Sequence, residues 1–253
     1  MLRLAALLFL AFAPALPLAA QEAVIPGIST DSISLTTRYT GSQLFVFGAV
    51  WRTEPLPKGN PLDIVITVKG PPKGVTVRRK ERRFGIWVNA ESVRVRQVPS
   101  FYAVATNRPL DAILGETERL RYGIGMDQAV RQVGGSLEDA APFTAALVRL
   151  REENGAFAQL DGQVAIAQET LFQTRVDMPA NLVEGDYLAE FFLVRDGEVI
   201  SSAHTTVRVE KTGIERWLYN LSRHDPLAYG LMSVALALAA GWLAAAAASL
   251  VRR

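Results

Sequence analysis

Hydrophobic residues are concentrated at the two ends of this 253-residue chain, and the stretch between them mixes apolar and polar positions. Near the N-terminus, Arg3 is followed by an uncharged, mostly apolar run that ends in Leu18-Ala19-Ala20. A positive residue, an apolar run and small residues at its exit are typical of a secretory signal peptide. We therefore predict a signal peptide over residues 1–20, cleaved after Ala20, with an uncleaved membrane anchor as the alternative.

At the other end, residues 227–251 contain no charged side chain and predict a transmembrane helix, with a buried helix of a soluble protein as the alternative. The run is longer than the ~20 residues that a helix needs to cross the hydrocarbon core of a bilayer. Because a signal peptide directs the export of the chain after it, we expect residues 21–212 outside the cytoplasm and the two arginines at 252–253 as a cytoplasmic tail. In a Gram-negative cell this is a single-pass protein of the inner (cytoplasmic) membrane, with its large domain in the periplasm.

From about residue 28 to residue 98 the pattern is that of short β-strands. Ile33 and Leu35 alternate with polar neighbours, and Leu44-Phe45-Val46-Phe47 is an uninterrupted apolar run that we interpret as buried. Glycine and proline separate these runs, as they do at turns. Short strands at this spacing favour a sandwich over a parallel sheet.

Between about residue 99 and residue 155 helical signals replace the strand signals. Residues 116–122 predict a short helix that Gly123 ends. A longer helix is expected to begin after Asp139 as its N-cap, with Pro142 in its first turn, and to end at Asn154-Gly155. One apolar stripe on this helix indicates that it packs on the sandwich.

After Gly162 the strand pattern returns, with alternation over residues 172–178 and a tight turn at Asp196-Gly197. The L-x-x-G-D-Y motif that ends at Tyr187 resembles a tyrosine corner, in which the phenol bonds back to upstream backbone. The predicted fold is mainly β: an immunoglobulin-like β-sandwich over residues 21–212 with a helical insert at about 99–155, then a single C-terminal transmembrane helix.

The link between this domain and the membrane, residues 213–226, contains Trp217 and Tyr219. Tryptophan and tyrosine favour the headgroup level of a bilayer, so we expect the link to rest on the outer leaflet of the lipid bilayer.

The composition limits the chemistry that the chain can perform. Without cysteine it forms no disulfide and has no thiolate, and its two histidines, His204 and His224, lack the partners of a zinc site or a catalytic triad. A net charge of +2 is far from the basic excess of a nucleic-acid-binding domain. We predict no catalytic residues, no metal, no cofactor and no nucleic-acid partner.

The strongest local charge is the run from Arg78 to Arg83. Clustered guanidinium groups suit a sulfonate, a sulfate, a lipid headgroup or an acidic protein surface. The candidates for binding an anion or a partner are five basic residues and two nearby aromatic ones: Arg78, Arg79, Lys80, Arg82, Arg83, Trp87 and Tyr102. The alternatives are a solvated edge strand, whose charges prevent edge-to-edge pairing, and aromatic side chains that belong to the core.

Small residues recur at every fourth position of the predicted transmembrane helix: Ser233, Ala237, Gly241, Ala245 and Ser249. Such a stripe lets a second helix approach closely and is our candidate packing face. The alternative is that an alanine-rich helix produces the stripe by chance.

Several short sequence motifs are spread over nearly the full chain, among them Gly85-Ile86-Trp87-Val88-Asn89, Val98-Pro99-Ser100-Phe101-Tyr102, Gly185-Asp186-Tyr187 and His224-Asp225-Pro226-Leu227. In these motifs the chain resembles the putative transmembrane protein family of alphaproteobacteria. The resemblance implies a signal peptide, an exported domain and one C-terminal span, and it brings no established activity. It also implies a partner, a sulfite-exporter-type permease, because members are encoded near such permeases.

The sequence supports three hypotheses about function. The first is a periplasmic interaction module that docks an inner-membrane protein, which the sandwich pattern, the small-residue stripe and the lack of catalytic groups favour. The second is a small-anion-binding accessory of a transporter that uses the basic run. The third is an envelope-modifying enzyme, which needs a deep pocket with convergent polar groups.

Overall fold

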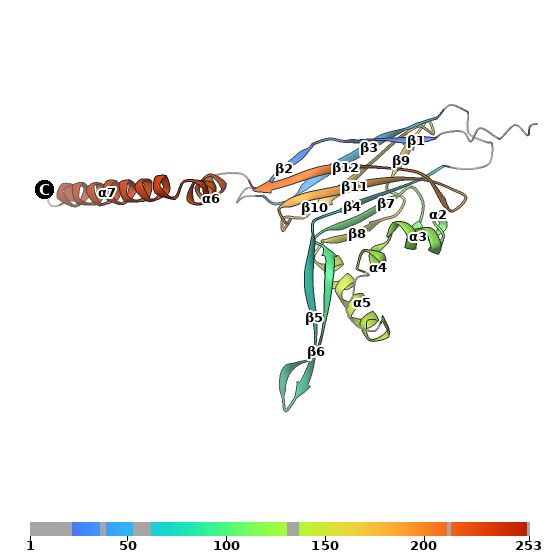
Figure 1. The fold of residues 1–253 in the computed structure, drawn as a ribbon, viewed down its shortest axis with the longest axis horizontal. Coiled ribbons are helices and arrows are strands. Elements are labelled where there is room, and N and C mark those ends of the chain that lie inside the picture. The colour runs from blue at the N-terminus through green and yellow to red at the C-terminus, as the bar shows by residue number, and fades with distance from the viewer. Residues whose placement is uncertain (1–21, 36–38, 53–61, 131–136, 212–213, 252–253) are drawn as a thin grey trace, which may run out of the picture.

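The computed structural model describes residues 22–35, 39–52, 62–130, 137–211 and 214–251. The predicted signal peptide and the two terminal arginines lie outside these ranges. Strands make up 50% of the structure and helices 28%, so the prediction of a mainly β protein is confirmed. An elongated body of strands carries a long hairpin on one side, and two helices leave one end of the body (Figure 1).

Sheet A has four antiparallel strands in the order β1-β3-β10-β9. Its members are β1 (Ala23–Ile28), β3 (Ser42–Trp51), β9 (Ala165–Ala167) and β10 (Leu171–Met178). In β10 exposed and buried residues alternate from end to end, as the sequence pattern predicts. One face of sheet A therefore covers the core, and no element that the structure describes covers the other face.

Sheet B has six strands in the order β2-β12-β11-β4-β7-β8. Its members are β2 (Ser32–Leu35), β4 (Asp63–Lys69), β7 (Tyr102–Thr106), β8 (Phe157–Leu160), β11 (Gly185–Arg195) and β12 (Glu198–Lys211). The pairs β2–β12 and β7–β8 are parallel, and the other pairs are antiparallel. Because the sheet is mixed and curled, the immunoglobulin-like assignment is not confirmed.

The parallel pair β7–β8 has its origin in the helical segment. The structure describes four helices between β7 and β8, and neighbouring parallel strands need a long crossover connection of this kind. The helices are α2 (Leu110–Ile113), α3 (Glu116–Tyr122), α4 (Met126–Ala129) and α5 (Leu137–Glu153), all within the predicted insert, which also contains β7. The prediction for α3 is confirmed, and it ends at Gly123 with φ 63°. Asp139 lies inside α5 and is not its N-cap.

Two hydrophobic cores hold these layers together. The first lies between the sheets, and the second lies between the far face of sheet B and the helices. Strands β4 and β11 contribute to both, since Ile64 and Phe191 face the first core while Val65 and Phe192 face the second. A strand covered on both faces needs apolar residues at consecutive positions, which explains the unbroken runs in these two strands.

The predicted tyrosine corner is present at the start of β11. The Tyr187 hydroxyl donates to the Val183 carbonyl at 2.9 Å and lies 3.2 Å from the Val183 amide nitrogen, which donates to it. Asp196 and Gly197 form the predicted turn between β11 and β12, with positive φ at both. These contacts fix the hairpin of β11 and β12, which are neighbours in sheet B.

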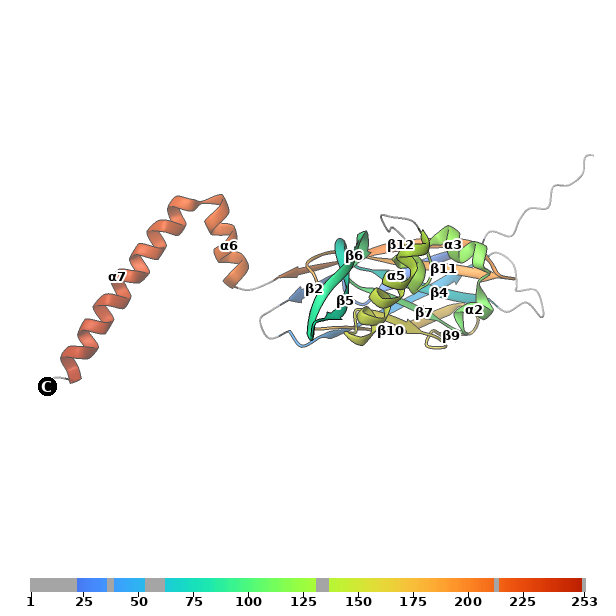
Figure 2. The same ribbon diagram turned by 90° about the horizontal axis from the view of Figure 1, so that it is seen from below.

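Beyond β12 the chain forms α6 (Ile214–His224) and α7 (Pro226–Val251), which meet at a sharp bend (Figure 2). The predicted link is thus mostly helical, and Trp217 and Tyr219 on α6 are exposed. Within α7, Pro226–Ala245 is long and apolar enough to cross a membrane, and none of it is buried against the protein. The predicted C-terminal apolar helix is therefore present.

Candidate functional site

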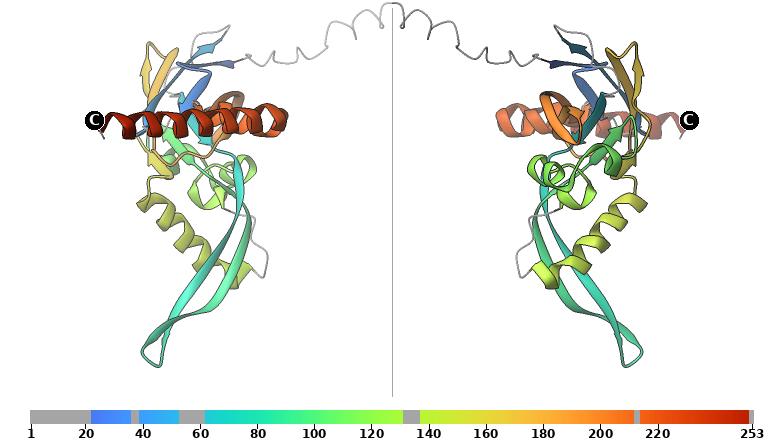
Figure 3. Two further views of the ribbon diagram at one scale, coloured as in Figure 1. Left: turned by 90° about the vertical axis from the view of Figure 1, so that its left-hand side faces the viewer. Right: turned by 90° about the vertical axis from the view of Figure 1, so that its right-hand side faces the viewer.

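The predicted basic run lies on a two-stranded hairpin that projects from the body (Figures 1 and 3). The hairpin consists of β5 (Pro72–Arg83) and β6 (Ile86–Pro99), which pair only with each other in the described part of the chain. All five basic candidates are in β5. They lie on an arm that reaches away from both sheets, in a strand that pairs with β6 on one side and has no described partner on the other.

The base of this hairpin is fixed by apolar contacts on one of its faces. Val75, Val77 and Val95 belong to the second core, together with Leu147 and Val148 of α5. We call the face with these valines the inner face. Its contact with α5 determines the direction in which the hairpin leaves the body.

Farther out on the inner face, arginines are neutralised by carboxylates. The Arg79 guanidinium lies 2.8 Å from the Glu91 carboxylate and 3.6 Å from that of Glu81. Arg83 lies 3.2 Å from the other oxygen of Glu81. These groups are largely exposed, so each pair adds little to stability, but together they cancel the charge of this face.

The opposite face of the hairpin is cationic. Arg78, Lys80 and Arg82 alternate along β5 with the inner-face residues, and Arg94 joins them from β6, opposite Thr76. We call these four residues the cationic face. All four are exposed, and none forms an ion pair with a carboxylate anywhere in the described residues.

The tip of the hairpin is apolar. Phe84 and Gly85 form the two-residue turn between Arg83 and Ile86. The exposed fractions of Phe84, Ile86 and Trp87 are 106%, 65% and 68%, so all three side chains stand in solvent. We call Phe84, Ile86 and Trp87 the apolar tip.

Phe84 adopts a backbone conformation that disfavours a bulky residue. Its φ is +51° and that of Gly85 is +85°, the signs that a tight hairpin turn of this kind requires at both central positions. Asparagine, aspartate and glycine adopt positive φ readily, whereas for other residues this conformation costs roughly 1–2 kcal/mol. The turn therefore holds a phenylalanine against its local preference.

Tyr102, the remaining aromatic candidate, does not belong to this surface. Its side chain is fully buried, packs on Phe157, and accepts a hydrogen bond from the Gly125 amide at 2.9 Å. Burial raises the pKa of its phenol, which therefore stays neutral. Tyr102 is therefore a core residue, as the alternative interpretation of the aromatic candidates expects, because β7 is covered on both faces.

The small residues of α7 follow the helix as a spiral. Four residues turn a helix by about 400°, so each step moves the stripe about 40° around the axis. Gly241 and Ala245 are exposed, and the Ser233 hydroxyl donates to the Tyr229 carbonyl at 2.9 Å. A ridge of this slope fits a second helix that crosses with right-handed geometry.

A family model described as "Putative transmembrane protein" (Alph_Pro_TM) matches residues 23–249. The chain belongs to this family. The match includes the body, the hairpin and nearly all of α7, and the apolar helix fits a membrane-anchored protein. The putative transmembrane protein family therefore supplies a membrane location but no reaction and no partner.

Two further comparisons add little to the family assignment. No curated protein matches this member of the putative transmembrane protein family. Among solved structures it is similar to the sporulation control protein Spo0M from Bacillus subtilis, with 10% identity and a TM-score of 0.26. The similarity covers 76% of this chain and 50% of that one. At this level Spo0M supports no statement about fold or function.

Sequence reasoning missed an apolar surface on the outer side of sheet A in this family member. Ile25 and Leu171 flank Ala49 of β3 in one row, and Phe47 and Trp51 lie two residues to either side of Ala49. The exposed fractions of Ile25, Phe47, Trp51 and Leu171 are 54%, 41%, 50% and 55%. We call these four residues the apolar face. We interpreted the run at residues 44–47 as buried, but Phe47 points outward.

The apolar face includes a shallow groove of about 310 Å³ between β3, β9 and β10. Beside it, the ring of Phe47 lies over Gly27, where an added Cβ would be 2.6 Å from the ring. Glycine at this position leaves the space that the ring occupies. The face is thus a packed surface rather than a set of isolated side chains.

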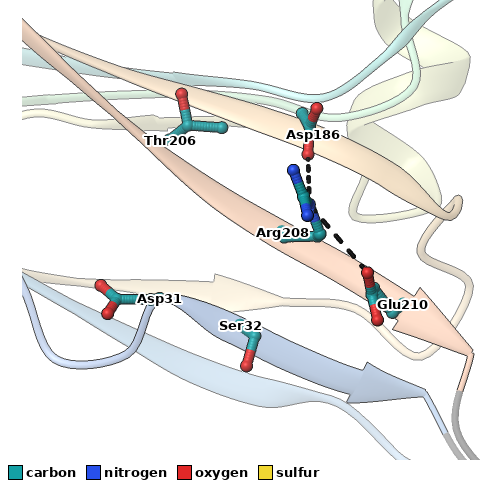
Figure 4. Close-up of a pocket in the computed structure, with 6 residues that line it drawn as sticks. All are labelled: Asp31, Ser32, Asp186, Thr206, Arg208 and Glu210. Atoms are coloured by element: carbon teal, nitrogen blue, oxygen red, sulfur yellow. Dashed lines mark hydrogen bonds and ion pairs between the residues drawn. The ribbon is translucent and has the colours of Figure 1, made fainter.

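A polar hollow lies at the end of sheet B (Figure 4). Its lining residues are Asp31, Ser32, Asp186, Thr206, Arg208 and Glu210. The Arg208 side chain lies 3.1 Å from the Asp186 carboxylate and 4.0 Å from that of Glu210. The single Arg208 is thus already paired with two of the three carboxylates of the hollow. No cluster of three metal-ligating side chains occurs among the residues that the structure describes.

Proposed function

We propose that the chain is a membrane-anchored docking module that holds an integral protein of the inner membrane against the apolar face. The single observation that carries this proposal is the open apolar face of sheet A. The membrane anchor limits the partners to those that share the bilayer or its surface. The sulfite-exporter-type permease that the family resemblance implies is our candidate for that partner.

The apolar face lies outside the two cores of the described residues. Two separate cores already hold the sheets and helices together, and neither includes Ile25, Phe47, Trp51 or Leu171. Contiguous exposed apolar patches on folded proteins usually mark interaction sites. Tryptophan and phenylalanine are also among the residues that are enriched in protein interfaces.

We further propose that the body lies in the periplasm and the C-terminus in the cytoplasm. The predicted signal peptide and the two arginines after α7 support this orientation. The α6 helix supports a position next to the bilayer. Trp217, Leu218 and Leu221 follow the three- and four-residue spacing of one helix face, as in helices that lie in the membrane interface.

The test compares two lysine substitutions on the same side of sheet A. Leu171→Lys places a charge within the apolar face, and Gln43→Lys places the same charge just beyond it, opposite Asp177. Burying an unpaired ammonium in an interface costs more than about 1.4 kcal/mol, which is a tenfold loss of affinity. After crosslinking in native membranes and purification of the full chain in detergent, we expect Leu171→Lys to lose the partner and Gln43→Lys to keep it.

Two results count against docking through the apolar face. The first is recovery of the same membrane protein at equal yield with both variants. The second is a wild-type chain that comes out of several detergents as a clean monomer after crosslinking. The first result would show that the interface lies elsewhere on the chain. The second would show that the chain has no stable membrane partner.

The cationic face supports a second candidate function, anion binding. Arg78, Lys80, Arg82 and Arg94 have no carboxylate partners among the described residues and lie on one side of a ribbon. The four side chains are exposed, so an isolated sulfate held there stays largely hydrated. An extended anionic surface can contact all four cations at once, and it fits this arrangement better than a small ion does.

A further inference from the structure

The hairpin combines three features that folding does not require. Its turn holds Phe84 at positive φ against its local preference. Its tip exposes three large apolar side chains, and its outer face presents cations without partners in the described part of the chain. A contact outside this chain accounts for all three together.

We propose that the hairpin is a second membrane attachment. Its cationic face binds anionic lipid headgroups, and its apolar tip enters the interface of the same bilayer that holds α7. Phenylalanine and tryptophan favour this depth, and nearby lysine and arginine side chains bind anionic lipids electrostatically. The proposal goes beyond docking of a protein partner and rests only on the membrane anchor.

The distribution of charge on the hairpin favours a surface over a pocket. On the inner face Glu81 and Glu91 neutralise Arg79 and Arg83, so that face is close to neutral. The cationic face has no acidic residue within it. A two-sided ribbon with one cationic side can lie flat along a charged plane.

The arrangement of the elements agrees with this orientation. At the base of the hairpin the inner face packs on α5, so the outer face points away from α5. In Figure 1, α5 lies on one side of the hairpin and α7 leaves the body toward the other side. At the base of the hairpin, the outer face is therefore turned toward the side on which the apolar helix lies.

The hairpin is also long enough to act at a distance from the body. Its β5 strand has 12 residues, and at about 3.3 Å per residue it extends roughly 40 Å. Because α7 anchors the chain, a bilayer is always within reach, and the attachment is intramolecular. Weak contacts suffice under this condition, since tethering raises the effective concentration of the surface.

The lack of cysteine allows a direct test on the full chain. Ile86→Cys provides one labelling site at the exposed tip for an environment-sensitive fluorophore. The labelled chain is reconstituted in phosphatidylcholine vesicles, with and without phosphatidylglycerol. We expect a blue shift, and quenching by bromine-labelled lipids, only when phosphatidylglycerol is present. High salt should abolish both signals, because at 1 M the screening length falls to about 3 Å.

Three variants separate the roles of charge and of the aromatic ring. Lys80→Glu with Arg82→Glu should abolish the phosphatidylglycerol-dependent signals. Arg149→Glu with Arg175→Glu changes the net charge by the same amount on other exposed elements and should leave these signals unchanged. Phe84→Asn suits the positive φ of the turn, so the hairpin is kept while the ring is lost. We expect it to weaken quenching by bromine placed deep in the acyl chains.

Several outcomes would overturn the proposal. A fluorophore that stays in water in both lipid mixtures shows that the tip does not touch the bilayer. Thermal stabilisation by sulfate or phosphate beyond that of chloride at equal ionic strength, lost in Lys80→Glu with Arg82→Glu, assigns the cations to a free anion instead. A photocrosslinker at Phe84 that captures protein rather than lipid in native membranes assigns the tip to a partner. None of these results affects the Leu171→Lys test of docking.

Discussion

Replacing Tyr187 by phenylalanine removes one hydroxyl from the tyrosine corner and leaves the ring in place. That hydroxyl donates to the Val183 carbonyl at 2.9 Å and accepts from the Val183 amide at 3.2 Å. The side chain is fully buried and its ring lies 6.3 Å from that of Phe101. Loss of both bonds leaves two backbone groups without their partner, at a cost of roughly 1–3 kcal/mol.

The loss is measurable as a lower melting temperature of the full chain in detergent. For a body of this size, 1 kcal/mol corresponds to about 2–4 °C, so a loss near 2 kcal/mol lowers the melting temperature by about 4–8 °C. Near-UV circular dichroism of the buried rings is a better probe than fluorescence, because Trp51, Trp87 and Trp217 are already exposed in the folded chain. Tyr39→Phe is the control. Its hydroxyl bonds to Ser42 three residues away, and we expect a change below about 0.5 kcal/mol.

Tyr187 also makes the stability of the folded chain fall at alkaline pH. Burial raises the pKa of Tyr187 above its ordinary value of 10.0, so folding favours the neutral phenol. The stabilisation is fully present below pH 10 and is lost as the pH rises toward the raised pKa. The stability gap between the wild type and Tyr187→Phe should therefore narrow above pH 10. Equal melting temperatures of the two proteins at neutral pH would refute the reasoning about the corner.

The remaining predictions concern glycines. At Gly48 an added Cβ would lie 2.3 Å from the Phe172 ring, so Gly48→Ala should cost about 1–3 kcal/mol by overpacking. Gly74→Ala is its control, because the nearest atom there is 3.5 Å away, and similar melting temperatures for the two variants would contradict the packing. In α7, Gly241→Ile should weaken crosslinking to membrane partners, whereas Gly230→Ile, outside the small-residue stripe, should not. Unchanged crosslinks in Gly241→Ile would show that the small-residue stripe is not a packing face.

Elements that depend on near neighbours in the sequence could be predicted well. The α3 helix ends at Gly123 and β10 alternates along its full length, because helix ends and strand faces result from local backbone and side-chain preferences. The corner at Tyr187 is similarly local, since its hydroxyl bonds to a residue four positions upstream. The sequence also located the basic residues. It could not predict that their charge is neutralised on one face of the hairpin and left unpaired among the described residues on the other.

The candidate site could be predicted only in part, because its character depends on strand pairing. Pairing with β6 places Glu91 beside Arg79 and leaves Arg82 beside Trp87. Tyr102 stands close to the basic run in sequence, yet β7 carries it into the second core. Phe47 belongs to an apolar run that suggests burial, yet among the described elements none covers its side of sheet A.

By itself the sequence determined the mainly β character, the helical segment, the apolar C-terminal helix and the family. These depend on periodicity, turn residues and composition, which act over a few residues at a time. Only the tertiary structure decided the parallel pairs in sheet B, the projection of the β5–β6 hairpin and the open apolar face. The reason is that an apolar strand residue is buried only if another layer covers its side of the sheet. Which layer does so depends on contacts between segments that are far apart in the chain.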